Sequence, residues 1–231
     1  MSNAASYTEM GPAKPAPMPK DAPRTRADAL RVFFSSLSPR WLIAMIVPAV
    51  AARIWVGGWS VWDAVIVAAI VAYWPINEWL IHVFMLHYKP VTLMGRTIDF
   101  HLPRTHREHH ANPWYLPRVF IPRHIFPTTA PFFALIIWLS PDKGLALTFV
   151  AFYLLMGLHY EWCHYLAHIG WCPKIAYYER RVREHRMHHF RNENYWWGVS
   201  MGLGDRLFGT APDPATVDRS ATTGDPRAAR R

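Results

Sequence analysis

Histidine is the residue type in this chain that is best placed to do chemistry. Ten of the thirteen histidines fall into four closely spaced groups, two of which share the pattern H-x-x-H-H. Neutral imidazole is a common protein ligand for metal ions, so these groups predict a metal site built from histidine. In chain order the grouped residues are His82 and His87, then His106, His109 and His110, then His164 and His168, then His185, His188 and His189.

The spacing within each group bears on how many ions are bound. Residues three and four apart share one face of an α-helix, so each H-x-x-H-H group should aim two or three rings at one point. His82 and His87 are five apart, about 140° around such a helix, so they either serve different metals or lie where the helix loosens. Ten imidazoles exceed what one ion can bind, which predicts two ions. Imidazole binds Fe, Zn, Cu and Ni, so ligand type leaves the metal open.

Several other residues are candidates for supporting the site. Glu78 precedes His82 by four residues and Glu161 precedes His164 by three. We expect each carboxylate to accept the distal N–H of a ligand imidazole, and pairing with arginines of the middle loop is the alternative. His101, His124 and His159 match no group and are expected beside the site or at an interface. Asp205 is expected to be a helix cap or a structural ion pair.

Four apolar segments must position these groups: residues 41–56, 59–81, 125–139 and 145–158. Only the second has the roughly 20 residues of a comfortable membrane span, so some of the others are expected to be re-entrant or to lie in a locally thinned bilayer. Hydrophobic residues make up 52% of the chain, and many Trp and Phe flank the segments, as at membrane interfaces. The pattern predicts an all-α integral membrane bundle, with a soluble helical bundle as the alternative.

The basic residues predict the orientation of this bundle. Six Lys or Arg lie in the head up to Arg40, six lie between His87 and His124, and eleven follow Trp171. The links after the first and third segments hold only Asp142 and Lys143 as charged residues. By the positive-inside rule both termini, the middle loop and all the histidine groups are cytoplasmic. The basic residues do not form the single block typical of nucleic-acid binders, so no nucleic-acid partner is expected.

Composition divides the chain into three parts. Residues 1–39 are rich in Pro, Ala, Lys and Arg and are expected to be disordered, because such a segment buries too little apolar surface. Residues 40–211 form the predicted membrane domain, and residues 212–231 are expected to be a second disordered segment. The head lacks the pattern of a cleavable signal peptide.

The motifs around the histidines resemble those of the membrane fatty acid hydroxylase/sterol desaturase superfamily, and within it the fatty acid (ceramide) 2-hydroxylases. The resemblance covers residues 79–210 and extends to Glu78, to Tyr160-Glu161 before His164-Tyr165, to HHANPWYLPRVFIP and to GVSMGLGDRLFGT. Within HHANPWYLPRVFIP, Pro113, Arg118 and Pro122 match the 2-hydroxylases. Tyr115 and Glu161 depart from the pattern, since an acid and Asp are usual there.

The resemblance implies about four membrane helices under a cytosolic helical cap that holds two metal ions. It also implies O2-dependent hydroxylation of a lipid C–H bond by two iron ions, with zinc able to occupy such sites in purified protein. Zinc has no redox chemistry, so oxygenase activity would need iron or another redox metal. Tyr160, Tyr195, Trp196 and Trp197 are candidates for the lining of an acyl channel, although such aromatic residues also serve as interfacial anchors.

Other functions stay open at this point. A sterol or carotenoid hydroxylase or desaturase could use the same scaffold, and a membrane metal-binding protein could use histidines without oxygen chemistry. A zinc hydrolase is disfavoured because no H-E-x-x-H occurs. The fused cytochrome domain of many eukaryotic relatives and the sequence signatures of haem, dinucleotide and iron–sulfur sites are missing. The expected electron donor is therefore a separate ferredoxin, cytochrome or reductase that docks at the cytoplasmic face.

Overall fold

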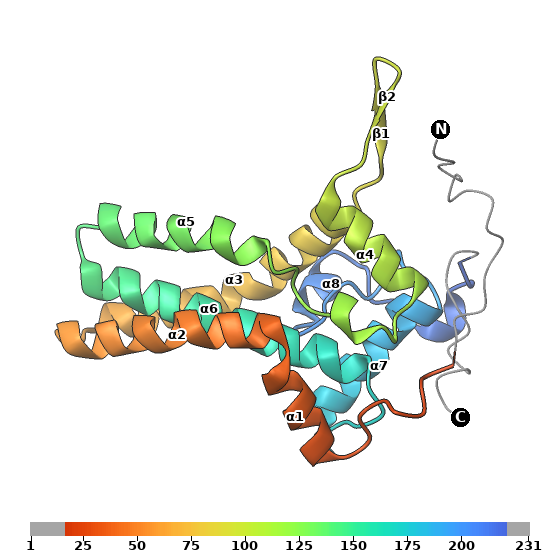
Figure 1. Ribbon diagram of the computed structural model, residues 1–231, viewed down its shortest axis with the longest axis horizontal. Coiled ribbons are helices and arrows are strands. Elements are labelled where there is room, and N and C mark those ends of the chain that lie inside the picture. The colour runs from red at the N-terminus through yellow and green to blue at the C-terminus, as the bar shows by residue number, and fades with distance from the viewer. Residues whose placement is uncertain (1–16, 221–231) are drawn as a thin grey trace.

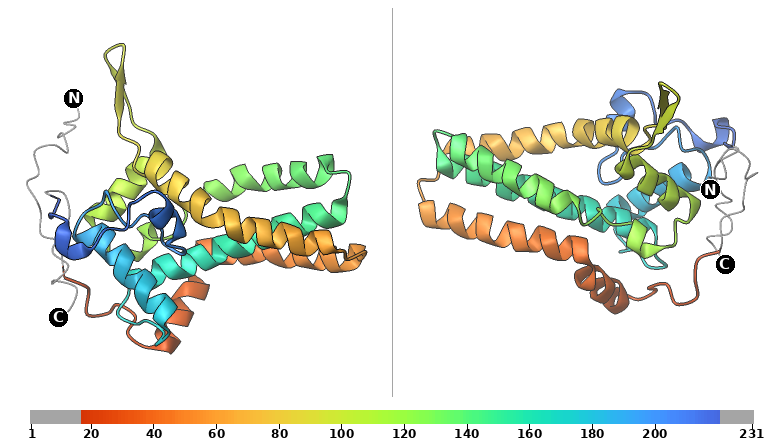
Figure 2. Two further views of the ribbon diagram at one scale, coloured as in Figure 1. Left: turned by 180° about the vertical axis from the view of Figure 1, so that it is seen from behind. Right: turned by 45° about the horizontal axis from the view of Figure 1, so that its top comes forward.

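Four helices run side by side and carry a helical cap at one end (Figures 1 and 2). The computed structural model describes residues 17–220. The long helices are α2 (Leu37–Val56), α3 (Val61–Leu80), α5 (Ile125–Leu139) and α6 (Lys143–Ala167). The cap contains α1 (Arg26–Ser35), the π-helical turn η1 (Ile81–Leu86), α4 (His101–Ala111), the short turn η2 (Leu116–Arg118), α7 (Ala176–Phe190), α8 (Leu203–Leu207) and the short turn η3 (Pro214–Thr216).

A β-hairpin projects from the cap (Figure 1). Strands β1 (Val91–Leu93) and β2 (Arg96–Ile98) pair antiparallel, with Val91 opposite Ile98. Met94 and Gly95 have φ angles of 50° and 72°. Two residues with positive φ form the tight turn whose twist matches that of a two-stranded hairpin.

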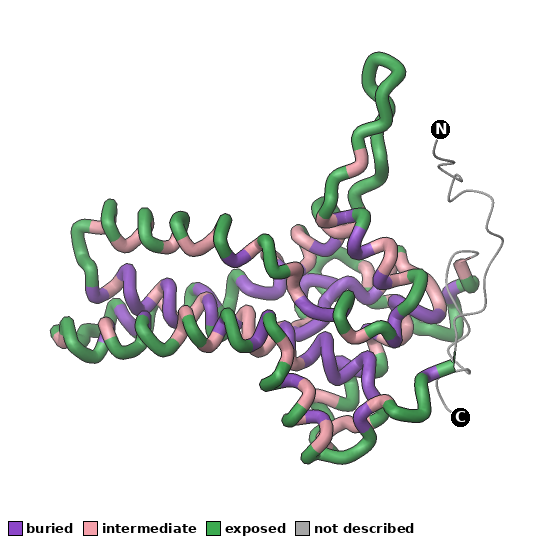
Figure 3. Tube along the Cα trace, in the orientation of Figure 1, coloured by how far each residue is buried: buried purple, intermediate pink, exposed green. Residues whose placement is uncertain are grey.

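Three helices are long and apolar enough to cross a membrane, namely residues 37–56, 61–86 and 143–167. Helix α5 is apolar but has 15 residues. It is therefore about 22 Å long, against roughly 30 Å for a bilayer's hydrocarbon core. The outer surface of the bundle is exposed along its length (Figure 3), with Trp55 91% and Trp138 72% exposed. Large apolar side chains facing outward over such an area fit contact with lipid.

The first and fourth apolar segments are longer than the sequence predicted. Helix α2 begins at Leu37, and α6 continues to Ala167 through His159 and Glu161. Hydropathy missed this extension because the last third of α6 is polar in composition, yet it is buried inside the cap. Counting apolar residues located the membrane part of the helix and missed the part that enters the cap.

The boundary of the ordered part also differs from the prediction, because α1 lies within the head that was expected to be disordered. Thr25 caps this helix by accepting a hydrogen bond from the backbone N–H of Asp28. Ala29 and Phe33 are four residues apart, and both pack into the core of the cap beside Tyr165. This apolar face offsets the cost of ordering. At the other end, Arg191 donates to the carbonyl of Val217 over 2.6 Å. Residues 1–16 and 221–231 of the predicted disordered segments lie outside the described residues.

A buried ion pair joins three helices at the end of the bundle away from the cap. Arg53 Nη2 lies 2.7 Å from Asp63 Oδ1, and Arg53 Nε donates to Thr148 Oγ1 over 2.7 Å. The side chains of Arg53 and Asp63 are 3% and 9% exposed. Arg53 also donates to the carbonyl of Gly57 and lies 3.7 Å above the centre of the Trp59 ring. The pair therefore ties α2, α3 and α6 together.

We expect Arg53→Met to lower the unfolding temperature, because it removes the guanidinium that pairs with the Asp63 carboxylate and that donates to Thr148 and to Gly57. Thermal unfolding in detergent micelles measures the effect. Arg40→Met on the exposed face of the same helix is the matched control and should change stability by no more than about 0.5 kcal/mol. Equal unfolding temperatures for the two variants would contradict the structural role given to the pair.

Candidate metal centre

The ten grouped histidines converge inside the cap, although they come from four separate parts of the chain. Eight are buried and two, His87 and His110, are partly buried. Their ring nitrogens form two groups of five, and in each group the potential ligand atoms all lie within 4.8 Å of one another. The first histidine group is His82, His87, His106, His110 and His188, and the second is His109, His164, His168, His185 and His189.

The five-residue spacing of His82 and His87 is accommodated by the π-helical turn η1, which continues α3. The backbone N–H of His87 donates to the carbonyl of His82 over 3.1 Å, a bond between residues five apart. Such turns are wider than α-helical turns and occur mostly as single turns within α-helices. Of the two possibilities that the sequence left open, the helix therefore loosens here, and both rings join the first histidine group.

Each H-x-x-H-H motif aims two of its rings at one point, within the two or three that the sequence predicted, and aims its third ring at the other group. In α4, His106 and His110 join the first group and His109 joins the second. In α7 the division is reversed, because His185 and His189 join the second group and His188 the first. Residues four apart share a helix face, and the middle histidine projects to one side of it. Each motif therefore contributes to both groups and links them.

The distances between ring nitrogens fit metal ligation. His106 Nε2 lies 3.2 Å from His82 Nε2, 3.1 Å from His87 Nε2 and 3.1 Å from His110 Nε2. A neutral ring carries one N–H, so one nitrogen cannot satisfy three such neighbours. Ligands about 2.1 Å from an ion and at right angles to one another lie about 3.0 Å apart.

The second histidine group also has ring nitrogens close enough together to bind one metal ion. His109 Nε2 lies 3.1 Å from His189 Nε2 and 3.2 Å from His164 Nε2, and His189 Nε2 lies 3.0 Å from His185 Nε2. His168 is 1% exposed, and its Nε2 atom has no hydrogen-bond partner within residues 17–220. Buried polar atoms are nearly always partnered, so nitrogens facing one another without partners fit a cation between them.

Burial keeps these imidazoles neutral. It lowers the pKa of His87 to about 2 and the pKa of His106, His109, His185 and His188 well below the usual value. The neighbouring rings add a smaller effect in the same direction, because a positive charge on one ring disfavours charge on the next. A neutral ring offers a lone pair to a metal, so the ligand atoms are ready to bind at physiological pH.

Glu78 and Glu161 do not have the role that the sequence predicted, because within residues 17–220 neither forms a hydrogen bond or ion pair with a histidine ring or an arginine. Glu78 accepts hydrogen bonds from the backbone N–H groups of Val199, Ser200 and Met201. Glu161 accepts from Ser38 Oγ over 2.7 Å and from the backbone N–H of Ile121 over 2.6 Å. Their spacing from the histidines suggested ring contacts, whereas their partners are backbone N–H groups and serine hydroxyls far away in sequence.

The remaining predicted residues fall into two classes. His101 and His124 contact each other with ring centroids 4.5 Å apart, and His159 lies 2.7 Å from the Tyr177 hydroxyl. None of the three belongs to either histidine group, as expected. Asp205 is neither a cap nor an ion pair. It accepts from the backbone N–H groups of Trp197 and Gly198 and from the Thr210 hydroxyl.

An apolar cavity of about 430 Å³ lies between α3, α5 and α6 and reaches the histidines. Phe133 and Tyr153 line it within the bundle, and His82, His106 and His164 line it at the cap. It therefore contacts both histidine groups.

The cavity contains one of the four aromatic residues expected in a channel. Tyr160 lines it, whereas Tyr195, Trp196 and Trp197 do not. Trp196 and Trp197 are buried within the cap, where the Trp197 ring packs against the ring of His87 with centroids 4.6 Å apart.

Sequence reasoning missed the groups that orient the histidine rings. His82 Nδ1 donates to the carbonyl of Trp197 over 2.6 Å, and His188 Nδ1 donates to the carbonyl of Tyr195 over 2.8 Å. These bonds place the proton on Nδ1 and leave the Nε2 lone pair facing the other nitrogens. A backbone carbonyl has no sequence signature, so the only signal was the resemblance of the nearby GVSMGLGDRLFGT segment to a family motif.

Comparison with known proteins gives a consistent result. A family model described as fatty acid hydroxylase matches residues 65–210, which include all ten grouped histidines. The fatty acid 2-hydroxylase of Rattus norvegicus is 30% identical over 137 residues. A dihydroceramide fatty acyl 2-hydroxylase of Arabidopsis thaliana is 29% identical over 152 residues. These matches cover 59% and 64% of this chain but 37% and 60% of the two relatives.

A solved structure has the same fold. It is that of full-length scs7p, of which only the hydroxylase domain is visible. The TM-score is 0.64 at 21% sequence identity, and the match covers 81% of this chain and 69% of that chain. The arrangement of an apolar helical bundle under a cap is therefore shared with a known protein.

Proposed function

The chain belongs to the fatty acid hydroxylase family, and from this premise we propose that it is an O2-dependent enzyme that hydroxylates carbon 2 of the acyl chain of a membrane lipid. The observation that carries the proposal is the apolar cavity, which ends at histidines of both groups. A volume of about 430 Å³ lies in the range of small-molecule sites, and such sites are mostly apolar with a few polar groups. An acyl chain lying in the bundle would thus present its polar end to the histidines.

We assign one metal ion to each histidine group, and iron as the metal in both. Five neutral imidazoles per group suit iron and zinc equally as ligands. When bound, a pair of redox-active ions supplies the O2-activating chemistry that breaking an alkyl C–H bond requires, which zinc cannot supply. The protein's own contribution is to hold the rings neutral, to aim their Nε2 atoms and to exclude water from the buried site.

The cap is proposed to face the cytoplasm. The middle loop carries six Lys or Arg and α7 carries four, and both segments lie in the cap. At the opposite end of the bundle the links of residues 57–60 and 140–144 hold two charged residues, Asp142 and Lys143, whose charges cancel. Lys and Arg are enriched in cytoplasmic loops, which supports this orientation.

Lipid mass spectrometry of cells with and without the gene tests the proposed reaction. Cells that express the chain should gain lipids heavier by one oxygen atom, with the hydroxyl group on carbon 2. Cells that express a variant lacking one histidine of either group serve as the matched control and should not. Products that carry a new double bond, or hydroxylated sterols or carotenoids in place of acyl lipids, would refute the proposal.

The cavity makes a prediction about acyl chain length. Gly157 of α6 lines it, and a Cβ atom added there would meet only Leu42 Cδ2 at 3.8 Å, an ordinary contact. Gly157→Leu should fill part of the cavity and exclude about two methylene groups of a bound acyl chain. At about 0.8 kcal/mol for each methylene group that is no longer buried, kcat/KM for long-chain lipids should fall roughly tenfold. Shorter chains should be less affected. Competition between acyl lipids of different length measures this, with Gly157→Ala as the control, and an unchanged length preference would argue against the cavity as the acyl site.

Hydroxylation needs two electrons from outside the metal centre. One atom of O2 enters the C–H bond and the other leaves as water, which consumes two electrons and two protons. We propose that a separate acidic redox protein, a ferredoxin, cytochrome or reductase, delivers them at the cap. The support is charge, because exposed basic side chains surround the histidine groups on several elements: Lys89, Arg96, Arg104, Arg123, Arg180 and Arg183.

Turnover with such a donor should fall as salt rises, because complementary charge steers the encounter. Between about 0.01 and 1 M salt the screening length shortens from about 30 to about 3 Å. We expect kcat/KM for the donor to fall at least about tenfold over this range, while metal content stays constant. Purified protein that hydroxylates lipid with O2 and NADPH alone would contradict the need for a separate donor.

A further inference from the structure

We infer that residues 195–201 brace the first histidine group and leave the second untouched, and that Glu78, Asp205 and Arg181 are the positioning residues that hold this brace. The inference rests on the proposed function for the presence of two metal ions. It goes beyond that function by proposing that residues 195–201 support the metal ion of the first histidine group and do not support the ion of the second.

The contacts of the brace with the histidines are confined to one group. His82 and His188 donate their Nδ1 protons to its carbonyls, and both belong to the first histidine group. The Trp197 ring packs against the rings of His82, His87 and His188 with centroids 5.2, 4.6 and 5.0 Å apart. Among the described residues, no ring of the second group donates to this segment; the backbone groups that approach rings of that group are those of Val119, beside His164, and Pro113, beside His168.

The brace is held through its backbone by two buried carboxylates. Asp205 accepts from the N–H groups of Trp197 and Gly198 over 2.8 and 2.7 Å. Glu78 accepts from the next three N–H groups, those of residues 199–201, over 2.7, 2.5 and 3.0 Å. Five consecutive donors are thus bound by two side chains that are 0% and 4% exposed. Hydrogen bonds to an ionised acceptor are about twice as strong as neutral ones, so the segment is fixed in position.

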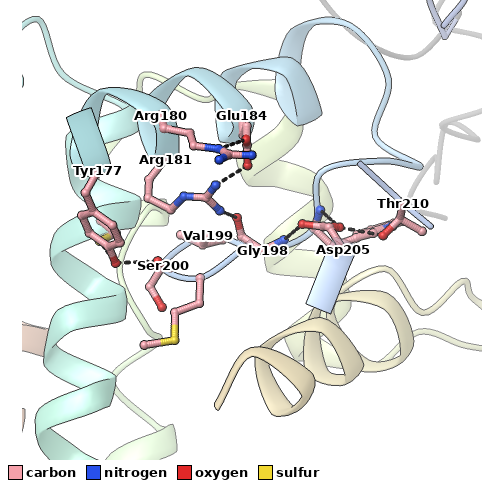
Figure 4. A network of polar contacts seen from close by, with 12 residues as sticks. Tyr177, Arg180, Arg181, Glu184, Gly198, Val199, Ser200, Asp205 and Thr210 are labelled. Carbon is pink, nitrogen blue, oxygen red and sulfur yellow. Dashed lines mark hydrogen bonds and ion pairs between the residues drawn. The ribbon is translucent and has the colours of Figure 1, made fainter. Parts of the chain in front are cut away.

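Two further side chains fix the brace from α7, as Figure 4 shows. Arg181 donates to the carbonyl of Gly198 over 3.3 Å and pairs with Glu184, and the Tyr177 hydroxyl donates to the carbonyl of Ser200 over 2.6 Å. The turn is tight, because a Cβ atom at Gly198 would lie 2.3 Å from the carbonyl oxygen of Met201. The brace therefore connects α3, α7 and α8 and cannot shift without breaking several buried bonds.

The expected consequence is a selective loss of one ion. Partners that orient a ligand ring typically contribute 10–100-fold to metal affinity. If the brace loosens, His82 and His188 lose their fixed orientation while the second histidine group keeps its own. Glu78→Gln and Asp205→Asn retain the shape of each side chain but place an amide N–H against a backbone donor. Each should weaken one of two bound ions 10–100-fold and leave the other unchanged.

Metal stoichiometry during chelator titration of the purified full-length protein tests this. Wild type should hold two iron ions per chain that are removed together or nearly so, and Glu78→Gln or Asp205→Asn should lose one ion at 10–100-fold lower chelator. Glu161→Gln is the matched control, since Glu161 is an equally buried carboxylate that binds Ser38 and Ile121 instead of the brace. It should retain both ions. Thermal unfolding separates loss of metal from loss of fold.

Each alternative outcome has a distinct meaning. Two tightly bound ions in both brace variants would overturn the inference, and so would equal loss of both ions from a folded variant. Where Glu78→Gln fails to fold, Tyr177→Phe removes a single outer contact of the brace and should still weaken one ion more than the other. Wild-type protein that binds fewer than two ions would instead refute the two-metal proposal itself.

Discussion

Replacing His188 or His109 with alanine is expected to abolish hydroxylation while the protein stays in the membrane. Each is the middle histidine of an H-x-x-H-H motif, and the structure places His188 in the first histidine group and His109 in the second. Either change leaves four rings in one group and five in the other. Because even ring-orienting partners contribute 10–100-fold, removal of a ligand should lower kcat by at least about 100-fold.

The measurement is product formation by lipid mass spectrometry, with membrane extraction to confirm insertion. His101→Ala and His124→Ala are the matched controls, since these exposed rings contact each other and lie in neither group. They should retain near wild-type turnover. Normal turnover in His188→Ala or His109→Ala would show that the ligand assignment is wrong for that group.

Exchanging the bound metal should lower hydroxylation as strongly as removing a ligand histidine. Removing bound metal with a chelator is expected to abolish hydroxylation, reloading with Fe²⁺ under anaerobic conditions should restore it, and reloading with Zn²⁺ should not. Both ions accept imidazole ligands, so zinc should fill the histidine groups. Zinc has no redox chemistry and cannot pass electrons to O2.

Zinc-loaded protein should therefore keep two ions and a stable fold while product falls below detection. The readouts are metal content, unfolding temperature and product formation on the same sample. Hydroxylation by zinc-loaded protein free of iron would exclude an oxygenase mechanism that depends on a redox metal. A protein that binds neither ion would remove the basis for assigning the histidine groups to metals.

Much of the arrangement could be predicted from the sequence because apolar length and histidine spacing carry it. The third apolar segment was predicted at residues 125–139, and α5 has those bounds. The four histidine-containing sequence motifs were expected at the same end of the bundle, and their rings converge there. Both inferences depend only on local sequence, since apolar length marks the segments and the positions of Lys and Arg predict which ends lie on the same side.

The parts that were not predicted depend on contacts between distant residues. Glu78 binds backbone N–H groups and the Ser200 hydroxyl more than 120 residues away, and sequence spacing does not suggest these partners. His109 belongs to the second histidine group, whereas His106 and His110 belong to the first. This assignment depends on where α7 lies relative to α4. Helix α1 escaped notice because its neighbours are rich in proline, whereas its own Ala29 and Phe33 pack into the cap. Backbone acceptors and helix placement are set by the fold, which a local pattern does not encode.

The π-helical turn η1 also bears on how the first histidine motif can vary in length. His82 and His87 face one group although five residues separate them, because the wide turn absorbs one residue more than an α-helical turn does. Deleting one residue between them would give a spacing of four, which shares a face in an ordinary α-helix. Deletion of one residue at this point is therefore compatible with both rings facing the same group. A sequence search that demands one fixed interval between these two histidines would overlook chains that build the same site.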